Sequence, residues 1–234
     1  MAEKYGIIGA MEVEINELLA TLNEERKVTR ASMEFHEGSI GASHVVIVRS
    51  GIAKVNAGIC VQILADEFHV TRVINTGVAG SLDSRINIGD IVLSTDACYH
   101  DVDATVFGYR PGEVPQLGRL EFPADAGLRE ALKSAIAEAA PDVSVFEGRI
   151  VSGDQFIADN ARKTVIKETW DGLCTEMEGA AIAQAAWLNG IPFCIVRAIS
   201  DKADGSDVVD YPKFESKAAK DCAALLRAFL VKQK

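Results

Sequence analysis

The stretch Leu173-Cys174-Thr175-Glu176-Met177-Glu178-Gly179-Ala180-Ala181-Ile182-Ala183 places two carboxylates directly before an apolar run. The run from 179 to 188 is apolar on nearly every helical face, so a helix there must be covered by neighbours on most sides. Glu176 and Glu178 then lie at the edge of a core. An unpaired carboxylate there costs on the order of several kcal/mol, so each needs hydrogen bonds, a charged partner or a ligand.

A simpler explanation is that both glutamates stabilise the start of the helix. Free N–H groups and the helix dipole favour an anion at that end. For the two glutamates taken alone, this explanation is preferred. The distribution of acidic residues in the rest of the chain argues against it.

The composition limits the classes of protein to consider. The chain has 234 residues, of which 48% are hydrophobic, so we expect one domain over 1–234 with a sizeable core. Lys and Arg number 24 against 34 Asp and Glu, a net charge of -10 without a basic cluster, which disfavours nucleic-acid and anionic-membrane partners. The five cysteines are widely spaced and form no CxxC pair. With no signal peptide and no membrane-length apolar stretch, we expect a soluble cytoplasmic protein.

Strand-like and helix-like segments alternate along the chain, which is typical of the α/β class. We expect strands at 5–10, 33–40, 44–49, 72–76, 89–94, 143–151 and 192–201, and helices at 13–22, 54–68, 128–139, 162–169, 179–188 and 211–231. The small residues at 77–81 predict a turn that lets backbone approach a ligand closely. Without a P-loop lysine or dinucleotide-fingerprint spacing, that turn is a weak phosphate site.

Two polar patterns in the sequence bear on possible sites. His100, Asp101 and Asp103 lack metal-ligand spacing and a second nearby histidine, so we predict a polar loop, no metal and no cofactor. In the strand at 192–201, period-two alternation places Arg197 and Asp201 on one face. A buried arginine needs an acidic partner or a ligand, and a residue at the carboxyl end of a strand lies where α/β proteins form sites.

The acidic residues at strand ends and strand–helix junctions form a set: Glu14, Glu176, Glu178 and Asp201, with Arg197 nearby. Separated carboxylates suit hydrolysis through a cationic, oxocarbenium-like transition state. One acts as a base on water, one protonates the leaving group and one holds the sugar hydroxyls.

Seven segments resemble those of the 5′-methylthioadenosine/S-adenosylhomocysteine nucleosidases. The segments are Gly6-Ile7-Ile8-Gly9-Ala10-Met11 with Glu14, then 50–57, 75–80, 99–109, 151–157, Thr175-Glu176-Met177-Glu178 and Arg197-Ala198-Ile199-Ser200-Asp201. They span nearly the whole chain in order, and together they are highly specific. The resemblance implies a single-domain, nucleoside-phosphorylase-like fold of three layers, with a mixed central β-sheet flanked by helices. It also implies cleavage of the N-glycosidic bond of an adenine nucleoside thioether, with no cofactor, in methionine salvage and methyl-cycle recycling.

The same resemblance assigns roles to individual residues. Glu14 matches the water-activating base, and Asp201 the aspartate that supports proton delivery to adenine N7. The predicted substrate-binding residues are Met177 and Glu178 around the ribose, Phe156 stacked on adenine, Ile157 reading the base edge through its backbone, Arg197 and Ser200 orienting the water and the aspartate, and Met11, Val78 and Glu176 on the pocket wall.

A homodimer is also implied. Phe107, Tyr109 and Pro115 match a loop that crosses the dimer interface and lines the partner's pocket for the 5′-substituent. Ile52 and Phe214 match residues that complete this apolar pocket.

The chain departs from the family pattern at two positions. Val13 interrupts a run of three glutamates, and Val78 replaces a frequent serine that helps to hold the water. Three alternatives stay open: a purine nucleoside phosphorylase, a catalytically silent nucleoside-binding or regulatory protein, and a nucleosidase for another 5′ group, such as 5′-deoxyadenosine or aminodeoxyfutalosine.

Overall fold

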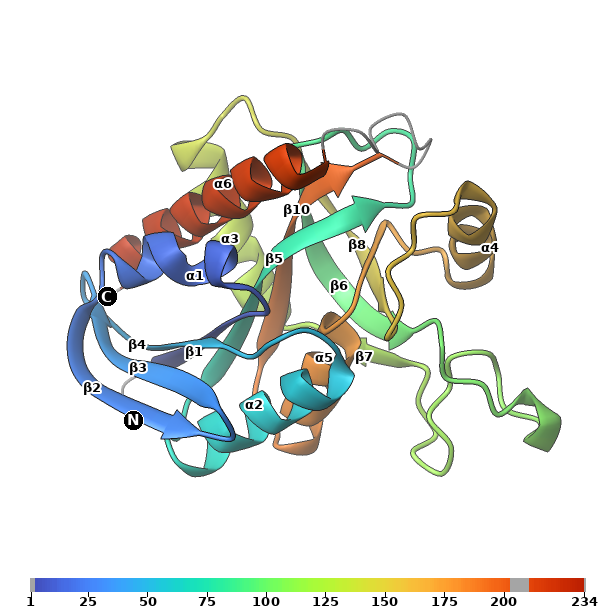
Figure 1. Ribbon diagram of the computed structural model, residues 1–234, viewed down its shortest axis with the longest axis horizontal. Coiled ribbons are helices and arrows are strands. Elements are labelled where there is room, and N and C mark those ends of the chain that lie inside the picture. The colour runs from blue at the N-terminus through green and yellow to red at the C-terminus, as the bar shows by residue number, and fades with distance from the viewer. Residues whose placement is uncertain (1–2, 203–210, 234) are drawn as a thin grey trace.

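A mixed, twisted β-sheet forms the centre of the molecule (Figure 1). The computed structural model describes residues 3–202 and 211–233, the side chains of 211–214 excepted. Its strands are β1 (Lys4–Gly9), β2 (Asn23–Arg30), β3 (Met33–Ile40), β4 (Ser43–Arg49), β5 (Arg72–Ser81), β6 (Ile91–Tyr99), β7 (Glu121–Pro123), β8 (Val145–Ser152), β9 (Cys174–Glu176) and β10 (Phe193–Asp201).

The strand order is β2-β3-β4-β1-β5-β9-β8-β6-β10, with β7 added beside β6. β10 also pairs with β5, so β5, β9, β8, β6 and β10 close into a ring. β1 is parallel to both β4 and β5, and β10 is parallel to β5, whereas β9 is antiparallel to β5. The predicted mixed sheet is therefore confirmed.

Helices cover both faces of this sheet. They are α1 (Glu12–Leu19), α2 (Lys54–Asp66), α3 (Ala126–Ala139), α4 (Asn160–Trp170), α5 (Gly179–Leu188) and α6 (Tyr211–Lys232), with a short 3-10 turn η1 (Thr105–Phe107). α2 and α5 pack together on one face, and α1, α3 and α6 on the other (Figure 1). The predicted α/β class and three layers are confirmed. α5 begins and ends where the sequence predicted, and residues 179–183 are all buried.

One expectation about local structure was wrong, and one strand was not predicted. Residues 77–81 form no turn but continue β5, because they pair with β10 in the register Gly77 to Arg197 and Ala79 to Ile199. Small residues there make room for neighbouring side chains. Residues 23–30 had no assigned structure, yet they form edge strand β2. Exposed charged residues suit an edge strand but hide the alternation that identifies one.

The topology brings several functional segments to one edge of the sheet. β1, β5 and β10 are mutually parallel neighbours, so their carboxyl ends lie together. β9 runs antiparallel beside the last residues of β5 and delivers the chain to the start of α5. In α/β folds this edge is where ligands bind.

Candidate active site

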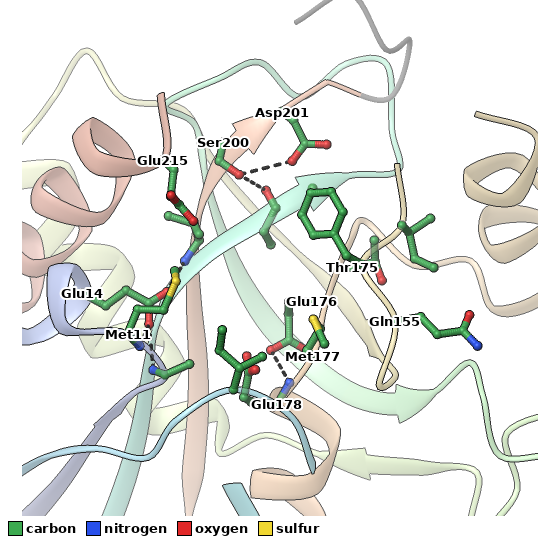
Figure 2. Close-up of a pocket in the computed structure, with 17 residues that line it drawn as sticks. Met11, Glu14, Gln155, Thr175, Glu176, Met177, Glu178, Ser200, Asp201 and Glu215 are labelled. Carbon is green, nitrogen blue, oxygen red and sulfur yellow. Dashed lines mark hydrogen bonds between the residues drawn. The ribbon is translucent and has the colours of Figure 1, made fainter. Parts of the chain in front are cut away.

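A cavity of about 260 Å³ opens at this edge (Figure 2). Most of the predicted site residues line it: Met11, Glu14, Ile52, Val78, Phe156, Ile157, Glu176, Met177, Glu178, Ser200 and Asp201. The structure thus brings together groups from the β1–α1 junction, β5, the 155–157 loop, the β9–α5 junction and β10. Glu14 and Asp201 lie at different ends of the cavity, with Glu178 on a third side (Figure 2).

Glu14 is a buried carboxylate held by backbone N–H groups. Its Oε2 accepts hydrogen bonds from the N–H of Ala10 at 2.7 Å and Met11 at 2.9 Å, and its Oε1 accepts from the N–H of Val78 at 3.1 Å. Burial raises the pKa of Glu14, while the charge of Arg197 and the three hydrogen bonds oppose that rise. A fixed carboxylate with a raised pKa on a cavity wall has the properties of a general base.

Glu14 and Arg197 approach each other across Gly77. A Cβ atom added at Gly77 would overlap Glu14 Oε1 and Arg197 Nη1, so only glycine fits at this position. The neighbouring Val78 contributes its backbone N–H to the base, and its side chain packs into the core. The departure at Val78 therefore leaves the support of Glu14 intact.

Arg197 is buried in β10, and the acidic partner that its position requires is present. Its Nη2 donates a short hydrogen bond to Glu176 Oε2 and another to Asn75 Oδ1 at 2.6 Å. Glu178 Oε2 lies 3.6 Å from the same nitrogen. Burial lowers the pKa of Arg197, but the charges of Glu176, Glu178 and Glu14 outweigh burial and raise it. Arg197 is thus a fixed cation shared by three carboxylates.

Glu176 ends β9, and its oxygens are occupied by the protein. They accept hydrogen bonds from the Ser152 hydroxyl, the Gly179 N–H and Arg197. Although Glu176 borders the cavity, its main contacts stabilise the first turn of α5 and neutralise Arg197. The helix-end explanation from the sequence therefore describes Glu176 well.

Glu178 has a different environment, although it is only two residues away. It precedes α5, and its Oε1 accepts a hydrogen bond from the Ala53 N–H at 2.9 Å. Ala53 adopts φ 82°, a strained value for a residue with a side chain, so backbone strain accompanies this contact. Burial and the charge of Glu176 raise the pKa of Glu178 to about 7. Near neutral pH this carboxyl can therefore either accept from or donate to a sugar hydroxyl.

Asp201 lies at the carboxyl end of β10, as the sequence predicted. Its Oδ1 accepts a hydrogen bond from the Ser200 hydroxyl at 3.2 Å, and its Oδ2 accepts one from Lys163 Nζ at 2.7 Å. A Cβ atom at Gly80 would lie 2.9 Å from Oδ2, so the small residues of β5 admit this carboxylate. Lys163 is a partner that the sequence interpretation missed.

Apolar side chains complete the cavity. The Phe156 side chain lines the cavity and is 62% exposed, whereas Ile157 is buried. Sequence interpretation also missed several lining residues, namely Ala10, Ala79, Gly80, Gln155, Thr175 and Glu215. All of these except Glu215 lie within segments that the family resemblance had marked, and Glu215 directly follows Phe214, which the resemblance had placed at the pocket.

Three of the predicted residues, Phe107, Tyr109 and Pro115, do not line this cavity. Phe107 is 80% exposed in η1, and Tyr109 and Pro115 belong to the loop that follows it. The prediction on Phe214 falls outside the side chains that the structure describes. Within residues 3–202 and 211–233, no helix is long and apolar enough to cross a membrane.

Comparisons with known proteins place this geometry in a family. Residues 4–231 match the model of the phosphorylase superfamily. The chain is 43% identical over 226 residues to the 5′-methylthioadenosine/S-adenosylhomocysteine nucleosidase of an Exiguobacterium strain, covering 96% of each chain. It also resembles the crystal structure of that nucleosidase from Colwellia psychrerythraea in complex with adenine, with a TM-score of 0.92, 36% identity and coverage of 98% and 95% of the two chains.

A third relative carries a different name. The native structure of futalosine hydrolase from Helicobacter pylori matches with a TM-score of 0.92 and 29% identity, covering 100% of this chain and 99% of its own. The fold, the extent of these matches and the identity over nearly the whole chain agree with one another. This chain therefore belongs to the phosphorylase superfamily and, within it, to the 5′-methylthioadenosine/S-adenosylhomocysteine nucleosidase family.

Proposed function

We propose that this protein hydrolyses the N-glycosidic bond of 5′-methylthioadenosine and S-adenosylhomocysteine, releasing adenine and a 5-substituted ribose. The observation that carries the proposal is the placement of Glu14, Glu178 and Asp201 on separate sides of one cavity. Each is held by different partners, so each can take a separate role in the reaction. The role in methionine salvage and methyl-cycle recycling follows from these substrates.

In this mechanism, Glu14 takes a proton from the attacking water. Burial raises the pKa of Glu14, which makes its carboxylate a stronger base than a free glutamate. Arg197 keeps the carboxylate from becoming too basic and is itself neutralised by Glu176. Val78 N–H and the N–H groups at the start of α1 hold the base in place.

The other two carboxylates act on the ribose and on the adenine leaving group. Glu178 binds ribose hydroxyls, with Met177 beside the sugar and Phe156 stacked on adenine. Asp201 supports the delivery of a proton to adenine N7 as the glycosidic bond breaks. The proton taken up by Glu14 then returns to solvent, and solvent replaces the proton delivered to N7 through Asp201, so the net reaction consumes one water.

Our first prediction is that adenine release needs no phosphate. A phosphorylase must bind a phosphate dianion through arginine forks, hydroxyls and backbone N–H groups. Here Glu14 already occupies the N–H groups of Ala10, Met11 and Val78, and Arg197 is engaged by Glu176 and Asn75. A second anion would be repelled. Adenine release should therefore be equal in phosphate-free buffer and in buffer with added phosphate.

The sugar product provides the decisive readout of that experiment. Free 5-methylthioribose supports a hydrolase. Release that depends on phosphate, or a ribose 1-phosphate product, would identify a phosphorylase instead. If no adenine is released under either condition, the protein is a silent nucleoside binder.

The preferred 5′ substituent is a separate question, because a relative of this chain is named futalosine hydrolase. Ile52 and Met11 give the cavity an apolar side, which suits a methylthio group. Adenine release from methylthioadenosine, adenosylhomocysteine, 5′-deoxyadenosine and aminodeoxyfutalosine, compared by kcat/KM, would rank these substrates.

We also propose a homodimer, supported by an apolar surface next to the aromatic loop. Val55 is 72% and Leu188 60% exposed, and both border a groove between α2, α5 and the 99–114 segment. Val106 and Phe107, at 85% and 80% exposed, extend from the same segment. Large apolar side chains gathered on one surface are typical of a protein interface. A two-fold dimer would bring this loop to the partner's cavity.

Our second prediction tests this surface. Val55→Glu should convert the dimer to a monomer in sedimentation velocity and lower kcat/KM, because the partner's loop no longer completes the 5′ pocket. Val231→Glu is the matched control, since Val231 is 56% exposed at the end of α6 and does not border the groove. A fully active wild-type monomer would contradict the proposal.

Single-domain organisation and a cytoplasmic location complete the proposal. Core clusters on the two faces of one shared sheet support a single domain over 1–234. The five cysteines are buried free thiols, and a reducing compartment keeps such thiols intact.

A further inference from the structure

Lys163 is a buried cation whose role the preceding mechanism leaves open. It lies in the first turn of α4 and is only 4% exposed. Its Nζ donates one hydrogen bond to Asp201 Oδ2 and a second to the backbone carbonyl of Lys202, each at 2.7 Å. The two contacts link α4 to the end of β10, where the proposed acid lies.

Burying an ammonium is costly unless it is paired, so a lysine is rarely kept at such a position for packing alone. The other buried side chains of α4, Ile166 and Trp170, are apolar and form a cluster with Val151 and Ile157. Ile157 also lines the cavity. α4 is therefore packed against the part of the cavity wall formed by Ile157. From this helix, Lys163 extends to Asp201.

The contacts of Asp201 suggest what Lys163 does. Lys163 occupies Oδ2, while Ser200 donates to Oδ1 from the other side. Holding both oxygens fixes the plane of the carboxyl group. Lys163 makes the shorter contact, at Oδ2, and the Ser200 hydroxyl can turn to the Ala79 carbonyl, 3.4 Å away, so Oδ1 is the oxygen that can serve the leaving base.

We propose that Lys163 is a positioning residue that holds Asp201 so that Oδ1 meets N7 of the departing adenine. The proposal rests on the proposed nucleosidase function. Lys163 acts through Asp201 and does not touch the substrate. Misplacing a catalytic group by about 1 Å can cost about 10²-fold in rate, so losing this contact should be measurable.

The test is a double-mutant cycle with Lys163→Met, which keeps the length of the side chain and removes the charge, and Asp201→Asn. Lys163→Met alone should lower kcat for adenine release about 10- to 100-fold, with little change in KM. In the Asp201→Asn background, the same substitution should have almost no further effect, because the group that Lys163 positions no longer works. A 4-nitrophenyl 5-methylthioriboside, whose leaving group needs no protonation, should be cleaved by Lys163→Met at nearly the wild-type rate.

Lys167→Met is the matched control, because it makes the same change one turn further along α4. The Lys167 side chain is 29% exposed, and its partners are Asp83 and Asp171. It should release adenine at the wild-type rate. Equal loss on both substrates, or additive losses in the cycle, would reduce Lys163 to a structural anchor of α4 and overturn the inference. Failure of the wild type to release adenine would instead refute the proposed function.

Discussion

Glu14→Gln should lower the turnover of adenine release by about 10²–10⁴-fold and leave substrate binding largely intact. Glutamine fills the same volume but has no lone pair basic enough to take a proton from water. Its carbonyl oxygen can still accept from the N–H groups of Ala10 and Met11, so the start of α1 keeps two of its contacts. The amide nitrogen then faces the Val78 N–H, a donor against a donor, which weakens the fold only locally.

The measurement is kcat and KM for methylthioadenosine, with calorimetric binding of a non-hydrolysable analogue and a melting curve to show that the variant is folded. Glu12→Gln is the matched control, because it makes the same change two residues away on the exposed side of α1. That control should keep wild-type turnover. Near-wild-type turnover of Glu14→Gln itself would remove the base from the mechanism and favour a silent binding protein.

The carboxylate set was accessible to sequence reasoning because Glu14 follows a clear strand, Asp201 ends another, and Glu176 and Glu178 directly precede an apolar helix. Alternation along 192–201 predicted that Arg197 is buried and needs an acid, and the structure supplies Glu176. The exact agreement at α5 has the same cause, since a helix that is apolar on all sides has few alternative boundaries. The roles given to individual residues came from the family resemblance and stay predictions.

Features that depend on contacts distant in sequence were not accessible. Residues 77–81 looked like a turn because small residues favour turns, but pairing with β10 extends β5 through them. The closure of β10 onto β5 has no local signal at all. Lys163 appears in the sequence as one more charge on an amphipathic helix, and only the structure shows that it is buried and contacts Asp201 at the end of β10.

The second large effect is expected for Asp201→Asn, and it should depend on the leaving group. Adenine is a poor leaving group until N7 is protonated, so removing the acid should cost about 10²–10⁴-fold with methylthioadenosine. A 4-nitrophenyl 5-methylthioriboside releases a stable anion and needs no proton, so its cleavage should fall far less. The measurement is kcat/KM for both substrates, with wild type and variant compared as ratios.

The asparagine substitution separates chemistry from geometry at this position. The amide oxygen can accept from Lys163 Nζ, and the amide NH₂ can donate to the Ser200 hydroxyl, so both contacts of Asp201 can be kept while the carboxyl group that serves N7 is lost. Ser200 also donates to the Ala79 carbonyl at 3.4 Å and can keep that contact. A loss confined to the adenine substrate therefore identifies Asp201 as the acid. An equal loss on both substrates would mean that Asp201 only holds the ends of β5, β10 and α4 together.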